Sequence, residues 1–196
     1  MSAASLTTAR RPVLADLLPG AVVRDAGLIV AVAALTALAA QLRIPLPGSP
    51  VPITGQTFAV LLGAAALGPL RGSAAQVLYL TLGAIGLPIF TGGESGVAYA
   101  FGATGGYLVG FVVASLVVGA LARRGADRRV LGAVAALVAG TIVIYALGVP
   151  WLIVATGMPV TAALWNGAAV FVLGDAVKAL AAGALLPAAW RLAERD

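Results

Sequence analysis

The segment Phe171-Val-Leu-Gly-Asp-Ala-Val-Lys178 places two ionisable residues inside an apolar run that extends from Gly167 to Trp190. A run of this length is long enough to cross a lipid bilayer as a helix. Each charged group inside a membrane helix costs about 3 kcal/mol on insertion scales, and such groups normally mark functional sites in the bundle interior. Asp175 and Lys178 lie three residues apart and therefore share one helical face.

Two interpretations of this pair remain open on its sequence alone. The two charges can form a structural ion pair that neutralises itself between the helices. Alternatively, they hold a polar ligand between membrane spans, which is the usual role of ionisable groups at that depth. The second interpretation needs support from the rest of the chain.

The composition is typical of a multi-spanning membrane protein. Of 196 residues, 61% are hydrophobic and 10% are charged, and the mean hydropathy is +1.06. A soluble domain of this size does not bury so much apolar surface. We therefore expect an all-α integral membrane protein that forms a single helical bundle in the lipid bilayer of the cell membrane.

The residue types that are absent exclude several kinds of chemistry. The chain contains no Cys and no His, which excludes disulfides, thiolate or imidazole metal sites and Cys-His nucleophiles. We therefore expect neither an enzyme nor a metal site or cofactor. The net charge of +5 comes from basic residues at the ends of apolar runs, so no nucleic-acid partner is implied.

Six transmembrane helices are predicted from the apolar runs, at about residues 24–42, 57–70, 72–87, 105–122, 130–147 and 167–190. They divide the chain into an N-terminal tail (1–23), a transmembrane substrate-binding domain (24–190) and a C-terminal tail (191–196). The connections at 43–56 and 150–165 are expected to be loops, and the Gly-rich connection at 86–102 is apolar enough to fold back over the bundle.

Small residues favour close contacts between helices in lipid. In the first span, Ala33 and Ala37 share a face that we expect to contact a partner protein, although packing inside the bundle is a strong alternative in an alanine-rich chain. In the fourth span, Gly105, Gly106 and Gly110 allow close approach of a neighbouring helix or a ligand.

The distribution of arginine predicts the orientation. Cytoplasmic N and C termini would place only Arg43 outside, with Lys178 inside the membrane. The other basic residues would all face the cytoplasm: Arg10, Arg11, Arg24, Arg71, Arg123, Arg124, Arg128, Arg129, Arg191 and Arg195. Asp175 would then lie roughly 12 Å below the outer face, at 1.5 Å per residue. A pocket at this depth would open outward, beneath the three long loops.

Five strings in the chain, taken together, resemble the BioY family of biotin-binding S-components of energy-coupling factor (ECF) transporters. They are Val51-Pro-Ile-Thr-Gly-Gln-Thr57, Leu67-Gly-Pro-Leu-Arg-Gly72, Gly86-Leu-Pro-Ile-Phe90, Gly102-Ala-Thr-Gly-Gly-Tyr-Leu-Val-Gly-Phe111 and Gly174-Asp-Ala-Val-Lys178. The resemblance covers about residues 24–190. It implies a six-helix protein that captures biotin from outside and works with a transmembrane coupling subunit and two ATPase subunits.

The resemblance also implies roles for individual residues. Asp175 and Lys178 would bind the ureido ring of biotin, which offers two N–H donors and one carbonyl acceptor. The remaining predicted contacts are Gly105, Gly106 and Tyr107, the loop from Phe90 to Tyr99, and Thr54 and Gln56, which would close the site. Glu94 in that loop would repel a carboxylate, so the contact to the tail of biotin is left open.

The main alternative is a small ion-coupled secondary transporter that uses Asp175 as a proton site. We found no internal repeat that matches the segment around Asp175, although such repeats are common in secondary transporters. The chain also has no Gly-x-x-x-x-Gly-Lys-Ser/Thr motif, so any dependence on ATP must come from other subunits.

Overall fold

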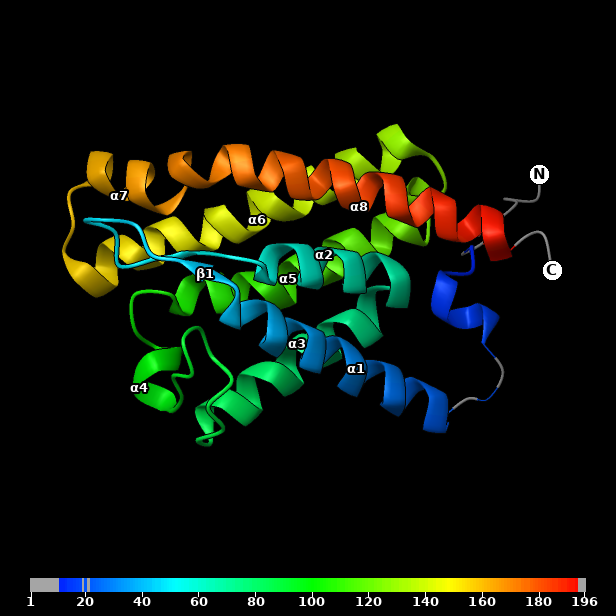
Figure 1. Ribbon diagram of the computed structural model, residues 1–196, viewed down its shortest axis with the longest axis horizontal. Helices are drawn as coiled ribbons and strands as arrows, with labels where there is room; N and C mark the ends of the chain where they lie inside the picture. Colours follow the sequence, from blue (N-terminus) through cyan, green and yellow to red (C-terminus); the bar gives the residue numbers. More distant parts are fainter. Residues whose placement is uncertain (1–10, 19, 21, 194–196) are drawn as a thin grey trace, which may run out of the picture.

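The computed structural model describes residues 11–18, 20 and 22–193, and most of these residues are helical (Figure 1). The helices of 12 or more residues are α1 (Val22–Gln41), α2 (Gln56–Leu67), α3 (Pro69–Ala84), α5 (Gly105–Ala122), α6 (Val130–Thr156) and α8 (Val172–Ala193). Four segments are long and apolar enough to cross a membrane, namely α1, α5, α6 and residues 160–193, and α2 is a shorter apolar helix. The prediction of an all-α, multi-pass membrane protein is therefore confirmed.

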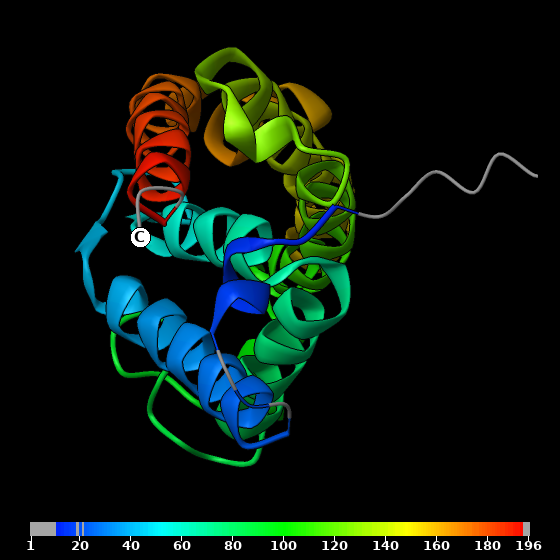
Figure 2. The ribbon, with the colours of Figure 1, turned by 90° about the vertical axis from the view of Figure 1, so that its right-hand side faces the viewer.

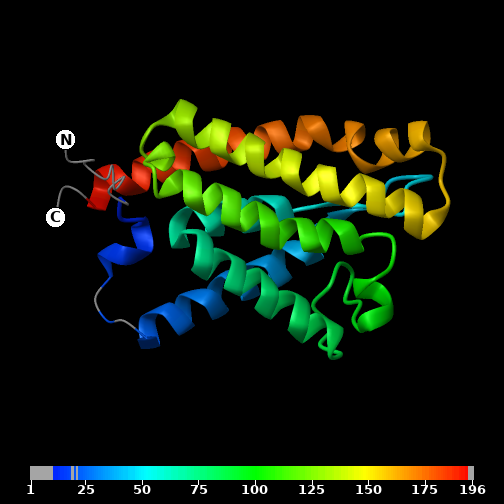
Figure 3. The ribbon, with the colours of Figure 1, turned by 180° about the vertical axis from the view of Figure 1, so that it is seen from behind.

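Short elements connect these helices. They are the 3-10 helices η1 (Leu14–Leu17), η2 (Ala126–Arg128) and η3 (Ala169–Phe171), the strands β1 (Arg43–Ile44) and β2 (Ile53–Thr54), and the helices α4 (Val97–Ala100) and α7 (Val160–Gly167). The β1–β2 ribbon, α4 and α7 lie at one end of the bundle, which we call the loop end. The opposite end holds η1, η2 and the end of α8 (Figures 1 and 3), and we call it the terminus end.

Helix α5 is the central helix and α1 is peripheral. In the most apolar 18-residue window of each, 61% of the α5 residues are buried but only 17% of the α1 residues are. Helix α5 packs against α2, α3 and α6. Glycines allow a close approach to α6, because a Cβ atom at Gly110 would lie 3.0 Å from the Cα atom of Ile144 and one at Gly106 would lie 2.5 Å from the carbonyl oxygen of Leu147. Viewed from the terminus end, α1 and α8 flank α2 (Figure 2).

Helix α6 is longer than predicted. It continues past Leu147 and through Pro150 to Thr156, so the loop predicted at residues 150–165 is wrong. A proline inside a membrane helix is tolerated because neighbouring groups can satisfy the carbonyl that it leaves unpaired. Leu152, two residues beyond the proline, is fully buried, which holds this extension against the bundle.

The last apolar run is broken rather than continuous. Helix α7 ends at Gly167, and α8 begins after the short helix η3. Side chains from other elements satisfy carbonyls at the break: the Tyr107 hydroxyl donates to the Gly167 carbonyl at 2.8 Å, and the Ser49 hydroxyl donates to the Asn166 carbonyl at 3.1 Å. Irregular backbone at membrane depth requires such internal partners. Asp175 therefore lies in the first turn of α8, not about eight residues into a continuous helix.

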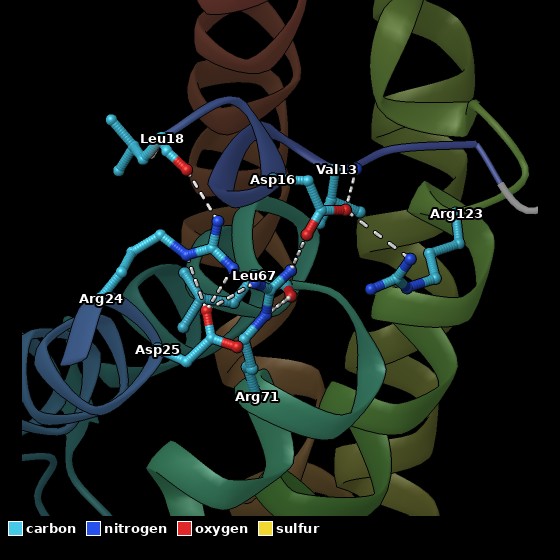
Figure 4. Close-up of polar contacts among 8 residues, drawn as sticks. All are labelled: Val13, Asp16, Leu18, Arg24, Asp25, Leu67, Arg71 and Arg123. Atoms are coloured by element: carbon cyan, nitrogen blue, oxygen red, sulfur yellow. Dashed lines mark hydrogen bonds and ion pairs between the residues drawn. The ribbon is translucent and has the colours of Figure 1, made fainter. Parts of the chain in front are cut away.

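The segment before α1 packs onto the terminus end. Val13 is fully buried, and the carboxylate of Asp16 accepts from the guanidinium of Arg71 and pairs with Arg123 at 3.6 Å (Figure 4). Burial raises the pKa of Asp16, but the Val13 N–H and Arg71 outweigh this effect, so its pKa lies below the ordinary value. The outer parts of the predicted tails, residues 1–10 and 194–196, lie outside the described residues.

Arg71 is the centre of what we call the terminus-end network (Asp16, Arg24, Asp25, Arg71 and Arg123). Its guanidinium also donates to Asp25 at 3.0 Å, and Arg24 donates to the same carboxylate at 2.8 Å. Opposite charges thus join the segment around η1 to the start of α1, the start of α3 and the end of α5 (Figure 4).

Candidate functional site

Asp175 and Lys178 form an ion pair at the loop end, in which the carboxylate is buried and the ammonium is half-buried. The Lys178 Nζ atom lies 2.9 Å from a carboxylate oxygen of Asp175, and Asp175 is only 7% exposed. The Lys178 ammonium also donates to the Thr54 carbonyl at 2.8 Å and to the Thr57 hydroxyl at 3.0 Å. A carboxylate in the first turn of a helix is stabilised by the positive end of the helix dipole. The predicted pairing is therefore present in the structure.

Two hydroxyl groups complete the surroundings of the carboxylate. Thr57 donates to one oxygen of Asp175 at 3.0 Å, and the Tyr145 hydroxyl donates to the other oxygen. We call Asp175, Lys178, Thr57 and Tyr145 the loop-end network. Thr57 and Tyr145 were not predicted as site residues. The only available signal for Tyr145 was that it is the single aromatic residue of an otherwise aliphatic predicted span.

The loop-end network faces a cavity. Its empty volume is about 580 Å³, a figure that includes the open mouth. The residues that line it come from α2, α3, α5, α6, α8, η3 and the loops at this end: Val51, Pro52, Thr54, Gln56, Thr57, Tyr79, Thr91, Tyr99, Thr104, Tyr107, Leu108, Phe111, Ile144, Tyr145, Phe171, Asp175 and Lys178.

Aromatic side chains form much of the cavity wall. All four tyrosines of the chain line it, and Phe111 and Phe171 join them. A ligand would meet charged and hydroxyl groups beside aromatic surfaces, the combination that fixes the orientation of a small, partly apolar molecule. Tyr99 and Tyr107 were predicted at this position, whereas Tyr79 was not.

Gln56 ties together the segments that cover the cavity. Its amide oxygen accepts from the Thr54 hydroxyl at 3.2 Å and from the Thr91 hydroxyl at 3.0 Å. Its amide nitrogen donates to the Tyr79 hydroxyl at 2.9 Å. Gln56 is 4% exposed, so these bonds are shielded from water. Thr54 and Gln56, which we expected to close the site, therefore both line it and link β2 to the loop that contains Thr91.

Four residues predicted to contact a ligand do not line the cavity. Gly105 and Gly106 pack against Trp151 of α6, since a Cβ atom on either would lie within 3 Å of that side chain. Phe90 is fully buried beneath the loop and stacks on Tyr99, with ring centroids 5.1 Å apart. Glu94 is exposed. The two glycines thus position Tyr107 through the packing of α5 on α6. Phe90 anchors its loop, and the loop folds back over the bundle as predicted.

The face of α1 predicted to contact a partner turns inward. Ala33 is 4% exposed and Ala37 is half-buried, because this side of α1 packs against α2 and α3. Ala33 is therefore not available to a partner in this structure, which is the alternative expected for an alanine-rich bundle. The exposed side of α1 carries other residues, among them Val30, Ala31, Ala34 and Leu38.

Comparison with known proteins agrees with this geometry. The model of the BioY family matches residues 7–195. The chain belongs to the BioY family. The "Biotin transporter BioY" of Rhizobium etli is 37% identical over 143 residues, which cover 69% of this chain and 76% of that protein. The protein of the same name from Rhodobacter capsulatus is 40% identical over 165 residues, covering 77% of this chain and 84% of the relative.

A solved S-component structure has the same fold. It is the crystal structure of the S-component for biotin from an ECF-type ABC transporter, which matches with a TM-score of 0.79 and 25% identity over 86% of this chain and 92% of that one. The "Probable biotin transporter BioY" of Pyrococcus horikoshii is 35% identical over 159 residues, covering 81% of this chain and 91% of that protein. The resemblance stated from the sequence motifs is thereby confirmed.

Proposed function

We propose that this BioY-family protein is the biotin-binding S-component of an ECF-type transporter and captures biotin from outside the cell. The observation that carries the proposal is the loop-end network, in which a buried carboxylate and an ammonium face an aromatic cavity. Relatives named as biotin transporters and the solved S-component for biotin support the choice of ligand.

The polar groups in the cavity match the ureido ring of biotin. The ring offers two N–H donors to Asp175, whose two oxygens provide about four acceptor positions. Thr57, Tyr145 and Lys178 already occupy three of these positions, so one N–H would use the remaining position and the second would replace one of the three donors. The ureido carbonyl would accept from Lys178, but the three protons of Lys178 already have partners, namely Asp175, Thr57 and the Thr54 carbonyl. Binding would therefore replace one of these three bonds with a bond to the ligand. The bond from Lys178 to Thr57 is the best suited to be replaced, because the Thr57 hydroxyl would keep its hydrogen bond to Asp175.

Transport in the proposed assembly depends on other subunits. We propose a transmembrane coupling subunit and two ATPase subunits as partners, since this chain has no ATP-binding loop motif. The exposed side of α1 described above is the surface that we propose for the coupling subunit, with Ala37 at its edge. In the secondary-transporter alternative Asp175 would alternately take and release a proton, but three donors surround its oxygens, which suits a fixed acceptor better.

Two measurements test the proposed function. Biotin should copurify with the protein and be identified by mass spectrometry, and isothermal titration of ligand-free protein should show saturable binding. Cells that contain the coupling subunits should import biotin faster than cells that lack them. Uptake that is independent of ATPase subunits and responds to the proton gradient would instead favour the secondary transporter.

We further propose that the six long helices all span the plasma membrane, with both termini in the cytoplasm. The described arginines other than Arg43 lie in elements of the terminus end, several of them in the terminus-end network, as cytoplasmic ends require. The chain has no Cys, so single cysteines can be placed at the exposed positions Arg124 and Glu94. An impermeant thiol reagent should label Glu94→Cys but not Arg124→Cys in intact cells, and the reverse pattern would overturn the orientation.

A further inference from the structure

Arg43 is an unpaired cation at the mouth of the cavity. Within the described part of the chain its side chain forms no ion pair and no hydrogen bond, and it is exposed. At the terminus end, by contrast, Arg24, Arg71 and Arg123 each pair with an aspartate. A free guanidinium on the otherwise weakly charged loop end is thus available to an anion.

Two neighbours place Arg43 beside the cavity. In the β1–β2 ribbon it lies directly opposite Thr54, which lines the cavity, and paired residues project from the same face of a ribbon. Its guanidinium also lies against the backbone of Gly92, where a Cβ atom would be 2.4 Å from a guanidinium nitrogen. The preceding residue, Thr91, lines the cavity as well.

Gly92 is what permits this close contact. It has φ +80°, a conformation that glycine adopts readily, and a side chain there would displace the guanidinium from its present position. The loop around Gly92 is held in place by Gln56, which bonds Thr91, and by Gln41, whose amide donates to the Phe90 carbonyl at 3.1 Å. The position of Arg43 relative to the mouth is therefore set by elements that are themselves anchored.

We infer that Arg43 binds the carboxylate of the ligand's tail. This inference rests on the proposed function, because it takes biotin as the ligand whose ureido ring lies at Asp175 and Lys178. Lys178 is not available to the carboxylate, because its three protons have protein partners and the one bond that it exchanges in the proposed complex goes to the ureido carbonyl. A guanidinium is suited to a carboxylate because it can donate two parallel hydrogen bonds. Glu94 is exposed in the same loop but does not line the cavity, so it does not occupy this position.

The test compares biotin with biotin methyl ester, which has the same ring but no charged carboxylate. Dissociation constants are measured for the wild type, Arg43→Gln and Arg43→Lys. Arg43→Gln should weaken biotin binding about 5- to 50-fold, somewhat less than for a buried charged hydrogen bond because Arg43 is exposed, and leave the binding of the ester within about 3-fold of the wild type. Arg43→Lys should retain part of the preference for biotin over the ester, because the ammonium keeps the positive charge but cannot donate the two parallel hydrogen bonds of a guanidinium.

A matched control separates this role from other effects of charge. Arg124→Gln makes the same change at an exposed arginine of the terminus end and should leave both constants unchanged. Equal weakening of biotin and ester by Arg43→Gln would mean that Arg43 only braces the loop, and a wild type that binds both compounds equally would also overturn the inference. Both outcomes leave the proposed function intact, whereas a wild type that binds neither compound would refute the proposed function itself.

Discussion

The two ends of the bundle hold polar networks with opposite designs. In the terminus-end network two aspartates meet three arginines, so every charged group has a partner of opposite sign. In the loop-end network one carboxylate and one ammonium are surrounded by neutral hydroxyls and face a cavity. The first arrangement joins segments of the chain to each other. The second places hydrogen bonds beside a cavity, where a small molecule can exchange them for bonds of its own.

This difference shows that an ion pair in a membrane protein cannot be interpreted by its charges alone. Both networks contain near-ideal contacts between acid and base, as at Asp25 with Arg71 and at Asp175 with Lys178. What separates them is the space in front of the charges and the length of chain between partners. The comparison predicts that changes at the loop end act mainly on ligand affinity, and changes at the terminus end mainly on stability.

The largest effect on affinity is expected at the ion pair itself. Asp175→Asn and Lys178→Ala should each raise the dissociation constant for biotin about 10- to 150-fold, because hydrogen bonds to charged groups contribute about 1.5–3 kcal/mol. The double variant should lose less than the sum of the two, since each single change leaves the other charge buried without its partner. Titration calorimetry measures all three constants.

The control for this experiment is thermal unfolding without ligand. Asp16→Asn removes an equivalent carboxylate from the terminus-end network and should leave biotin affinity unchanged within about 3-fold. If Asp175→Asn and Lys178→Ala bind biotin normally and only unfold at lower temperature, the pair is structural and both networks serve the same purpose.

The next effect is expected on stability at the terminus end. Arg71→Gln removes the group that contacts Asp16, Asp25 and the Leu67 carbonyl, and it should lower the free energy of unfolding by about 1–3 kcal/mol, less than for a fully buried pair. A lower Tm in detergent with unchanged affinity for biotin would support the comparison. A large loss of affinity would show that the two ends are energetically coupled.

A smaller effect on affinity is expected at Tyr145. Tyr145→Phe removes one donor to the Asp175 carboxylate and should weaken biotin binding about 3- to 10-fold, less than the changes at the ion pair, because in the proposed complex this hydroxyl acts on the ligand only through Asp175. Tyr107→Phe is the matched control, because its hydroxyl donates to the Gly167 carbonyl at the helix break and not to Asp175. Tyr107→Phe should lower Tm and should reduce the affinity for biotin less than Tyr145→Phe does. Equal losses of affinity in the two variants would mean that the cavity responds only to its shape.

The smallest effect is a dependence of stability on pH. The pKa of Asp16 is lower in the folded protein than its ordinary value, so Asp16 stabilises the fold above about pH 4, where the unfolded chain is also ionised. This contribution is lost as the pH falls through the folded pKa. The difference in Tm between the wild type and Asp16→Asn should therefore be constant from pH 8 to pH 6 and decrease below about pH 4. A difference that does not change with pH would show that the charge of Asp16 has no role.

Much of the helical architecture followed from local patterns. The fourth predicted span, from Gly105 to about Ala122, coincides with α5, because glycines mark its start and an arginine pair follows its end. The predictions were wrong where local signals misled: Pro150 did not end α6, and the final run broke after Gly167. At the break, side chains of distant elements satisfy the freed carbonyls, as Tyr107 does for Gly167. Past Pro150, the burial of Leu152 holds the extension of α6 against the bundle.

The amino-acid sequence by itself determined the membrane class, the pairing of Asp175 with Lys178 and the concentration of arginine at one end. These properties depend on composition and on the fixed spacing of residues along a helix. Only the tertiary structure decided which hydroxyls surround the carboxylate, because Thr57 lies 118 residues and Tyr145 lies 30 residues from Asp175 in the chain. It also turned Ala33 inward and brought Arg43 against Gly92. Contacts of this kind depend on how distant segments pack, which no local pattern specifies.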